Sequence, residues 1–225
     1  MDKSSKLHRY LGIAFLLQFT TSIFNGVVFK ESAIGSGSIE EIMNRAAAHS
    51  WQVQTYILID LLTALGIIFL GTALYTSLKK TNMVVAGTAL GFYFLEAVLL
   101  AVSKAGTFSL LKISQQAASA GSTAGSAQLA ALSLEVMNYL GETLHVLVFC
   151  LGAILFYALF FKSRIVPRWL SLWGLITLIP LLVGTVLAVF GIEIPFGFYV
   201  PYVPFEFVIG VWLLAFGFQP VKAAV

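Results

Sequence analysis

Four polar residues with helical spacing carry the clearest chemical signal in the sequence: Glu135, Asn138, Glu142 and His145. Steps of three, four and three residues place their side chains within roughly 80° of one another on an α-helix. Carboxylates and an imidazole on one face can bind a metal ion, carry protons or act as an acid–base pair. The segment that holds them, 129–161, is otherwise apolar enough to cross a membrane. Titratable groups at membrane depth are costly unless they face protein or a water-filled cavity, so this stripe is the default place to look for function.

The composition indicates an integral membrane protein. The 225-residue chain is 59% hydrophobic, 14% aromatic and only 10% charged, whereas soluble domains carry about 25% charged residues. Its length gives room for about six membrane helices with short loops, hence a single domain over 1–225. The formal net charge of +3 is too small and too scattered to indicate a nucleic-acid partner. The expected partner is the lipid bilayer.

Six apolar segments predict the fold class, an all-α, polytopic membrane helix bundle. They lie at about 10–29, 51–78, 83–111, 129–161, 169–190 and 199–218. Ser38-Ile-Glu-Glu41 has the form of a capping box, which predicts a short helix on the outer surface at about 38–49.

Two further patterns concern the connections and the packing of these helices. The stretch 114–128 is rich in Ala, Ser, Gly and Gln, and we expect a plain linker there rather than a weak helix. In the third apolar segment, Gly87-x-x-x-Gly91 predicts a face on which another helix packs closely.

The basic residues predict the orientation of the chain. Nine Lys and Arg residues fall on the side of the N-terminus and four fall on the other side, all near short loops. Positive charge accumulates in cytoplasmic loops, so both termini are expected in the cytoplasm, in a cell inner membrane. Nine of the ten acidic residues lie instead in outer loops or within the membrane. A polar cavity open to the outside would explain this excess of acids.

Counting residues along the helices places several titratable groups at similar depth. Glu96 lies roughly 20 Å from the cytoplasmic end of its helix, at about 1.5 Å per residue, and Asp60 lies in the outer third. Lys104, near the outer edge, is expected to snorkel or to pair with a loop acid. The sequence therefore predicts an outward-facing polar cavity that binds a small ligand or a cation. Its predicted residues are Asp60, Glu96, Asn138, Glu142, His145 and Glu206.

Three chemical interpretations of these residues stay open. Glu142-x-x-His145 has the form of the element that di-iron helix bundles use twice, so both residues are candidate ligands of a divalent metal ion such as zinc. The embedded acids and the histidine can instead change protonation as a substrate or cation passes. A membrane hydrolase or isomerase is the third, although no Ser-x-x-Lys, His-Glu-x-x-His or Gly-x-Ser-x-Gly pattern supports it. Interhelical hydrogen bonds without a further role are the purely structural explanation.

Several segments resemble a known family. Ile165-Val-Pro-Arg-Trp-Leu-Ser-Leu-Trp-Gly174 follows a basic pair and is similar to the signature of a bacterial multi-pass family called the domain of unknown function 4386. The Phe94-Leu-Glu-Ala97, Leu144-His145 and Phe205-Glu206 elements are similar to it as well. The resemblance implies a bacterial inner-membrane protein of six or seven helices and supplies no reaction. Among the candidate site residues it favours Glu96, His145 and Glu206.

We therefore expect a membrane protein that binds a small ligand or cation in a transport or sensing role. A metal-dependent membrane enzyme is the alternative, and a non-catalytic accessory subunit is the third. The cofactor is unknown, with a divalent metal ion as the candidate. A homo-oligomer stays open as a further expectation.

Overall fold

A computed structural model describes residues 4–192 and 195–219, and every regular element within these ranges is a helix. The first membrane run consists of α1 (Ser4–Phe24), the π-helical segment η1 (Asn25–Lys30) and the short α2 (Glu31–Ala33). It is followed by α3 (Ile39–Ala48), α4 (Ser50–Leu78) and α5 (Met83–Ala120). The next run consists of α6 (Ala124–Asn138), a second π-helical segment η2 (Tyr139–Leu144) and α7 (His145–Ser163). The last elements are α8 (Arg168–Val189), the 3₁₀ turn η3 (Phe196–Phe198) and α9 (Val203–Phe216).

Five helical runs are long and apolar enough to cross a membrane. They are Lys6–Ala33, Ser50–Leu78, Met83–Ala120, Ala124–Ser163 and Arg168–Val189. The sixth apolar helix, α9, has only 14 residues. Large apolar side chains such as Leu65, Val84 and Phe190 stay exposed on this surface, as expected where a protein meets lipid. The predicted polytopic helix bundle of about six spans is therefore confirmed.

The chain divides into two compact units. Unit 1 consists of residues 1–19, 66–96 and 146–225, and unit 2 consists of residues 20–65 and 97–145. Because α1, α4 and α5 each contribute residues to both, each unit contains a part of the same long helices. The organisation as a single domain stays a prediction.

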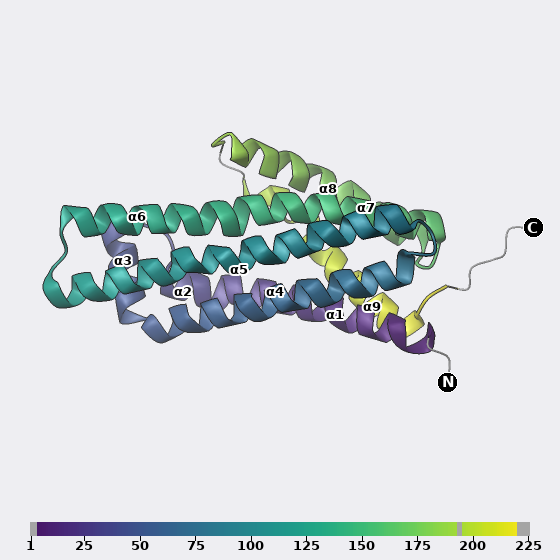
Figure 1. Cartoon of the computed structure of the whole chain (residues 1–225), viewed down its shortest axis with the longest axis horizontal. Coiled ribbons are helices and arrows are strands. Elements are labelled where there is room, and N and C mark those ends of the chain that lie inside the picture. The colour runs from purple at the N-terminus through teal and green to yellow at the C-terminus, as the bar shows by residue number, and fades with distance from the viewer. Residues whose placement is uncertain (1–3, 193–194, 220–225) are drawn as a thin grey trace, which may run out of the picture. The chain divides into compact units, whose positions relative to one another are not determined.

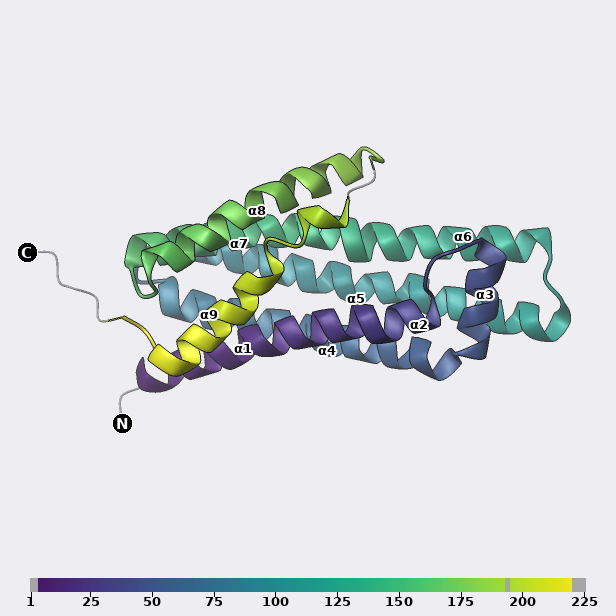
Figure 2. The same cartoon turned by 180° about the vertical axis from the view of Figure 1, so that it is seen from behind.

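Unit 1 is held together by aromatic side chains and a close helix crossing. α9 lies beside α1 (Figure 2), and a Cβ atom built on Gly12 would lie 2.9 Å from the carbonyl oxygen of Gly210. Tyr93 of α5 packs edge-on against Phe156 of α7, with 5.2 Å between the ring centroids. These contacts leave little room around the aromatic core, because interiors are packed as densely as organic crystals.

Unit 2 has an apolar core of its own. Its buried residues include Ile34, Ile42, Met43, Tyr56, Leu110, Leu111 and Met137. The short helix α3 packs against α6 (Figure 1) and begins with the capping box that the sequence predicts. The Ser38 hydroxyl accepts a hydrogen bond from the N–H of Glu41, and the Glu41 carboxylate accepts one from the N–H of Ser38. The position of α3 on the outer surface of the membrane stays a prediction.

The stretch 114–128 is mostly helical, which corrects the expected linker. α5 continues to Ala120 and α6 begins at Ala124, so only residues 121–123 connect them. Alanine has the highest helix propensity of all residues, and the stretch is rich in it. Thr123 forms a second capping box with Ser126, while Gly121, at a φ of +92°, lets the chain turn between the helices.

Two helices of unit 2 approach each other closely at Gly106. A Cβ atom built on Gly106 would lie 2.7 Å from the carbonyl oxygen of Ser133 in α6. A Cβ atom on Gly87 or Gly91 would meet no atom within 4 Å in the described part of the chain. The predicted packing face at Gly87 and Gly91 is therefore wrong for contacts among the described residues, since four-residue spacing alone does not select a partner helix.

Candidate functional site

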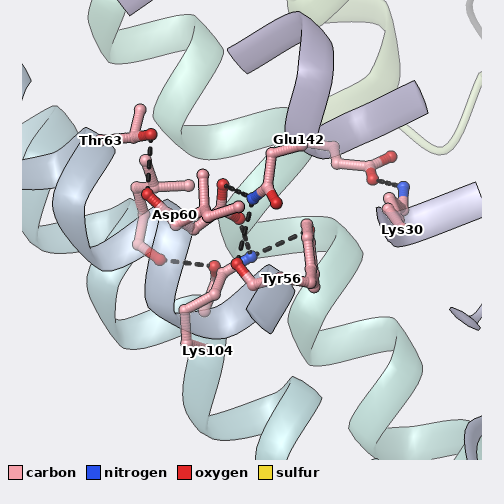
Figure 3. Close-up of polar contacts among 10 residues, drawn as sticks. Lys30, Tyr56, Asp60, Thr63, Lys104 and Glu142 are labelled. Atoms are coloured by element: carbon pink, nitrogen blue, oxygen red, sulfur yellow. Dashed lines mark hydrogen bonds and ion pairs between the residues drawn. The ribbon is translucent and has the colours of Figure 1, made fainter. Parts of the chain in front are cut away.

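A buried ion pair joins α4 and α5 in unit 2 (Figure 3). The ammonium group of Lys104 lies 2.5 Å from Oδ2 of Asp60 and donates a hydrogen bond to the hydroxyl of Tyr56 at 2.9 Å. Asp60 is only 7% exposed and Lys104 only 4%. The ammonium group also lies 4.3 Å from the centre of the Tyr56 ring. A carboxylate, a hydroxyl and an aromatic ring therefore surround one cationic group.

Asn25, the first residue of η1, binds the other oxygen of the Asp60 carboxylate. Its amide nitrogen donates to Asp60 Oδ1 at 2.6 Å and to the backbone carbonyl of Tyr56 at 3.0 Å. Both partners are acceptors, so the NH₂ group must face them and the amide oxygen must point elsewhere. That oxygen is buried and finds no hydrogen-bond partner in residues 4–192 and 195–219.

Four more buried polar atoms of unit 2 lack a partner within the described residues: Oε1 of Gln52, Nδ1 of His145, Oγ1 of Thr107 and Oδ1 of Asn138. Thr107 follows Lys104 by about one turn of α5, and Asn138 precedes Glu142 by a similar distance. Buried polar groups are almost always hydrogen-bonded, so these oxygens call for donors that the side chains around them do not supply. Ordered water, or a ligand that carries N–H or O–H groups, meets this need.

A second ion pair joins the two π-helical segments. Lys30, the last residue of η1, donates to the carboxylate of Glu142 in η2, as Figure 3 shows. The two side chains are 27% and 48% exposed, so this pair is far more accessible than the first. Lys30 lies within electrostatic range of Asp60 and Lys104. Because π-helical segments are rare and gather at functional sites, their coincidence with both ion pairs marks this part of unit 2.

The segment η2 changes the predicted stripe of polar residues. The steps of three and four residues assumed a regular α-helix, but the wider turns of a π-helix rotate the residues beyond it relative to those before it. Glu135 is exposed near the end of α6, before η2. His145, beyond η2, lies within electrostatic range of Asp60 and Lys104. His145 thus lies within electrostatic range of the Asp60 pair, whereas Glu142 pairs with Lys30.

The other two predicted acids lie in unit 1. Glu96, on α5, is 4% exposed, and its Oε2 has no hydrogen-bond partner among the residues described. Glu206, in the first turn of α9, accepts a hydrogen bond from the hydroxyl of Tyr202 at 3.1 Å. The Tyr202 hydroxyl lies 2.7 Å from that of Tyr157. Of the six predicted residues, Asp60, Asn138, Glu142 and His145 therefore belong to unit 2, and Glu96 and Glu206 belong to unit 1.

Sequence reasoning missed the partners of the acids. Lys104 does not snorkel or bind a loop acid; it pairs with the embedded Asp60. Neither Tyr56 nor Asn25 is among the six predicted site residues, although both bind this pair. One signal was available: Asp60 and Lys104 come at similar counts from the α4–α5 connection, and embedded charges of opposite sign tend to pair.

A metal site at Glu142 and His145 stays a prediction. Within the described ranges, no three His, Cys, Asp or Glu residues gather closely enough to hold a metal ion. The carboxylate of Glu142 is bound to the ammonium group of Lys30.

Comparison with known proteins gives one match. The family model described as a domain of unknown function, DUF4386, matches residues 10–217. Neither the curated proteins nor the solved structures contain a match to this chain. The matched region includes both polar groups described above.

Proposed function

Because the chain belongs to the DUF4386 family and is a multi-pass membrane protein, we propose that it binds a small ligand with a cationic group, in a transport or sensing role. The observation that supports this proposal is the environment of the Lys104 ammonium group. The carboxylate of Asp60 and the hydroxyl and ring of Tyr56 are the groups that recognise small cations and amines. Lysine has a long and flexible stem, so its ammonium group can leave and a ligand can take its place.

Three buried oxygens of unit 2 that lack a hydrogen-bond donor in the described part of the chain also favour a bound ligand. Asn25 Oδ1, Asn138 Oδ1 and Thr107 Oγ1 are buried in unit 2 and accept no hydrogen bond from the described residues. A ligand with several N–H or O–H donors, or a hydrated cation, supplies what these acceptors require. An anionic ligand does not meet this requirement, because the oxygen atoms that Asp60 and Asn25 present would repel its negative charge.

We further propose that the site opens to the outer side of a cell inner membrane. Lys104 lies roughly 30 Å along α5 from Met83, and Asp60 lies roughly 27 Å along α4 from Leu78, at about 1.5 Å per residue. The hydrocarbon core of a bilayer is about 30 Å thick. With the α4–α5 connection in the cytoplasm, as the basic residues predict, the ion pair lies near the outer boundary, where solutes from outside reach it.

Ligand binding is tested with methylammonium chloride on the purified full-length protein in nanodiscs, at ionic strength matched with sodium chloride. We expect a saturable increase in the thermal unfolding temperature of the wild type. Asp60→Asn should abolish the increase, and Tyr56→Phe, which removes only the hydroxyl, should weaken the affinity by roughly tenfold. Glu135→Gln removes an exposed carboxylate of the same helix run as Glu142 and should bind as the wild type does. An unresponsive wild type, or an Asp60→Asn protein that responds equally, contradicts the proposal.

Access from outside is tested by cysteine labelling in cells. Asn138→Cys and Glu142→Cys, each combined with Cys150→Ser, should react with a membrane-impermeant maleimide added outside. Cys150 is buried and is the only cysteine of the chain, so this background is free of thiols. Gly121→Cys, in the α5–α6 connection, is the positive control. If Gly121→Cys reacts while positions 138 and 142 stay inert, the outward opening is wrong.

A further inference from the structure

We infer that unit 1 contains a proton-binding site, in which Glu96 holds an exchangeable proton within the membrane and Glu206 is the second, ionised carboxyl group. This site goes beyond the proposed cation site. It rests on residues of unit 1 alone, and its test does not depend on whether unit 2 binds a ligand.

The first step concerns the charge of Glu96. The residue lies in the membrane run Met83–Ala120, is 4% exposed and leaves its Oε2 buried without a hydrogen-bond partner among the described residues. Within the same residues, the recorded ion pairs are those of Asp60 and Glu142, and neither includes Glu96. A carboxylate with no cation and no donor is very costly in a low-dielectric interior, whereas the neutral acid is tolerated. The surroundings of Glu96 therefore suit the protonated form.

The second step concerns the titratable groups around Glu96, which come from its own helix α5 and from α7 and α9. Its titratable neighbours in unit 1 are Tyr93, Cys150, Tyr157 and Glu206. None of them carries positive charge. Aromatic rings pack around these groups: Tyr93 contacts Phe149 and Phe156, and Tyr157 contacts Phe205. This shell keeps the carboxyl group away from bulk water.

The third step concerns Glu206, whose surroundings differ. The single hydroxyl proton of Tyr202 is donated to Glu206 Oε1, so the Tyr202 oxygen accepts from the hydroxyl of Tyr157. Two hydroxyl groups in series thus point their donors toward the Glu206 carboxylate, which favours its ionised form. Glu206 is also less buried than Glu96. Since the two carboxyl groups lie within electrostatic range, ionisation of both is disfavoured and the pair holds one proton.

Infrared difference spectroscopy of the full chain in lipid vesicles tests this site. We expect the wild type to show a carbonyl stretch of a protonated carboxylic acid at pH 7, where an ordinary exposed glutamate is ionised. The band should shift in D₂O and disappear in Glu96→Gln, whose amide has nearly the same shape. Glu135→Gln, on an exposed carboxyl group, should leave the band unchanged. Absence of the band in the wild type, or its persistence in Glu96→Gln, overturns the assignment.

Two further variants test the partnership with Glu206. Glu206→Gln removes the neighbouring negative charge, so the Glu96 band should be lost at a lower pH than in the wild type. Tyr202→Phe removes the donor to Glu206, and a second carboxylic acid band should appear as Glu206 takes up a proton. A pH dependence unchanged by both substitutions shows that Glu96 does not share its site with Glu206 and overturns the paired site.

A chemical measurement on the wild type covers the case in which Glu96→Gln does not fold. Dicyclohexylcarbodiimide, a hydrophobic reagent, modifies protonated carboxyl groups within membranes. Peptide mapping should find the adduct at Glu96 and not at exposed Glu135. An adduct at Glu96 supports the protonated form, and lack of reaction there together with the missing infrared band overturns it.

Discussion

Asp60 and Lys104 are two residues whose charges depend on each other. Both are buried, and the loss of one partner leaves the other charge uncompensated, at a cost of about 3–5 kcal/mol. We expect Asp60→Asn and Lys104→Met each to lower the free energy of unfolding by about this amount. The double variant should lose clearly less than the sum of the two. Denaturant titrations of the four proteins in mixed micelles measure these differences, and additive losses would show that the pair is not coupled.

The ion pair of Lys30 and Glu142 should behave differently. Its side chains are 27% and 48% exposed, and solvent-accessible ion pairs contribute about 1 kcal/mol or less. Glu142→Gln, which keeps the shape of the side chain, should therefore change the free energy of unfolding by no more than that. The same titration measures it. A loss as large as that of Asp60→Asn would mean that Glu142 is buried in the membrane-embedded protein.

At the level of residues, the sequence makes the embedded acids conspicuous but does not identify their partners. Asp60 stands out because a carboxylate is rare in an apolar run. Its partners Asn25, Tyr56 and Lys104 come from three different helical runs, and which of them meet depends on the rotation of each helix. Apolar runs around them carry too little periodicity to determine that rotation, since lipid and protein interior are equally apolar.

Among the helices, the contact of α5 with α6 depends on one residue. A Cβ atom on Gly106 would lie 2.7 Å from the Ser133 carbonyl oxygen and 2.9 Å from the Met137 nitrogen, both of which are backbone atoms that cannot move aside. Gly106→Ala should therefore cost about 1–3 kcal/mol of folding free energy. Gly87→Ala, on the same helix without such a neighbour, should instead stabilise by up to about 1 kcal/mol, because alanine favours the helix. Equal effects at the two positions would contradict the close approach.

The membrane helices were predictable from the sequence, because the length of an apolar run determines whether it can span the membrane. The apolar runs predict the membrane helices because a span needs about 20 apolar residues. The two π-helical segments were not predictable, because they differ from α-helix only in which carbonyl each N–H selects. Residues 114–120 were predicted as a linker for another reason: alanine is common in flexible segments and in helices alike. The structure shows that α5 continues through these residues to Ala120.

For the whole molecule, the connections show a separation of charge between the units. Unit 1 contains the basic connections, with Lys79 and Lys80 after α4 and Arg164 before α8. The N–H of Gln219 donates to the carbonyl of Ile165, so the end of α9 lies at one of them. Unit 2 contains acidic Glu40 in α3. This separation agrees with the predicted orientation, in which the basic connections lie in the cytoplasm.

Cysteine accessibility in intact cells tests this orientation. In the Cys150→Ser background, Lys80→Cys should react with an impermeant maleimide only after the membrane is permeabilised, because basic connections stay in the cytoplasm. Gly121→Cys, which connects α5 and α6 in unit 2, should react without permeabilisation. The opposite pattern of reactivity would reverse the orientation and place the cation site on the cytoplasmic side.

The π-helical segments make the number of residues in a helix as important as their types. Each segment contains one residue more than a regular helix needs for the same turns. Deletion of one residue within 139–144 would leave the apolar run long enough to span the membrane and would let it close into a regular α-helix, which changes the direction of the side chains inside this segment. Glu142 and Lys30 would then no longer meet, although neither residue had changed. Single-residue insertions and deletions at these two places can therefore redesign the polar site while the topology of the protein stays the same.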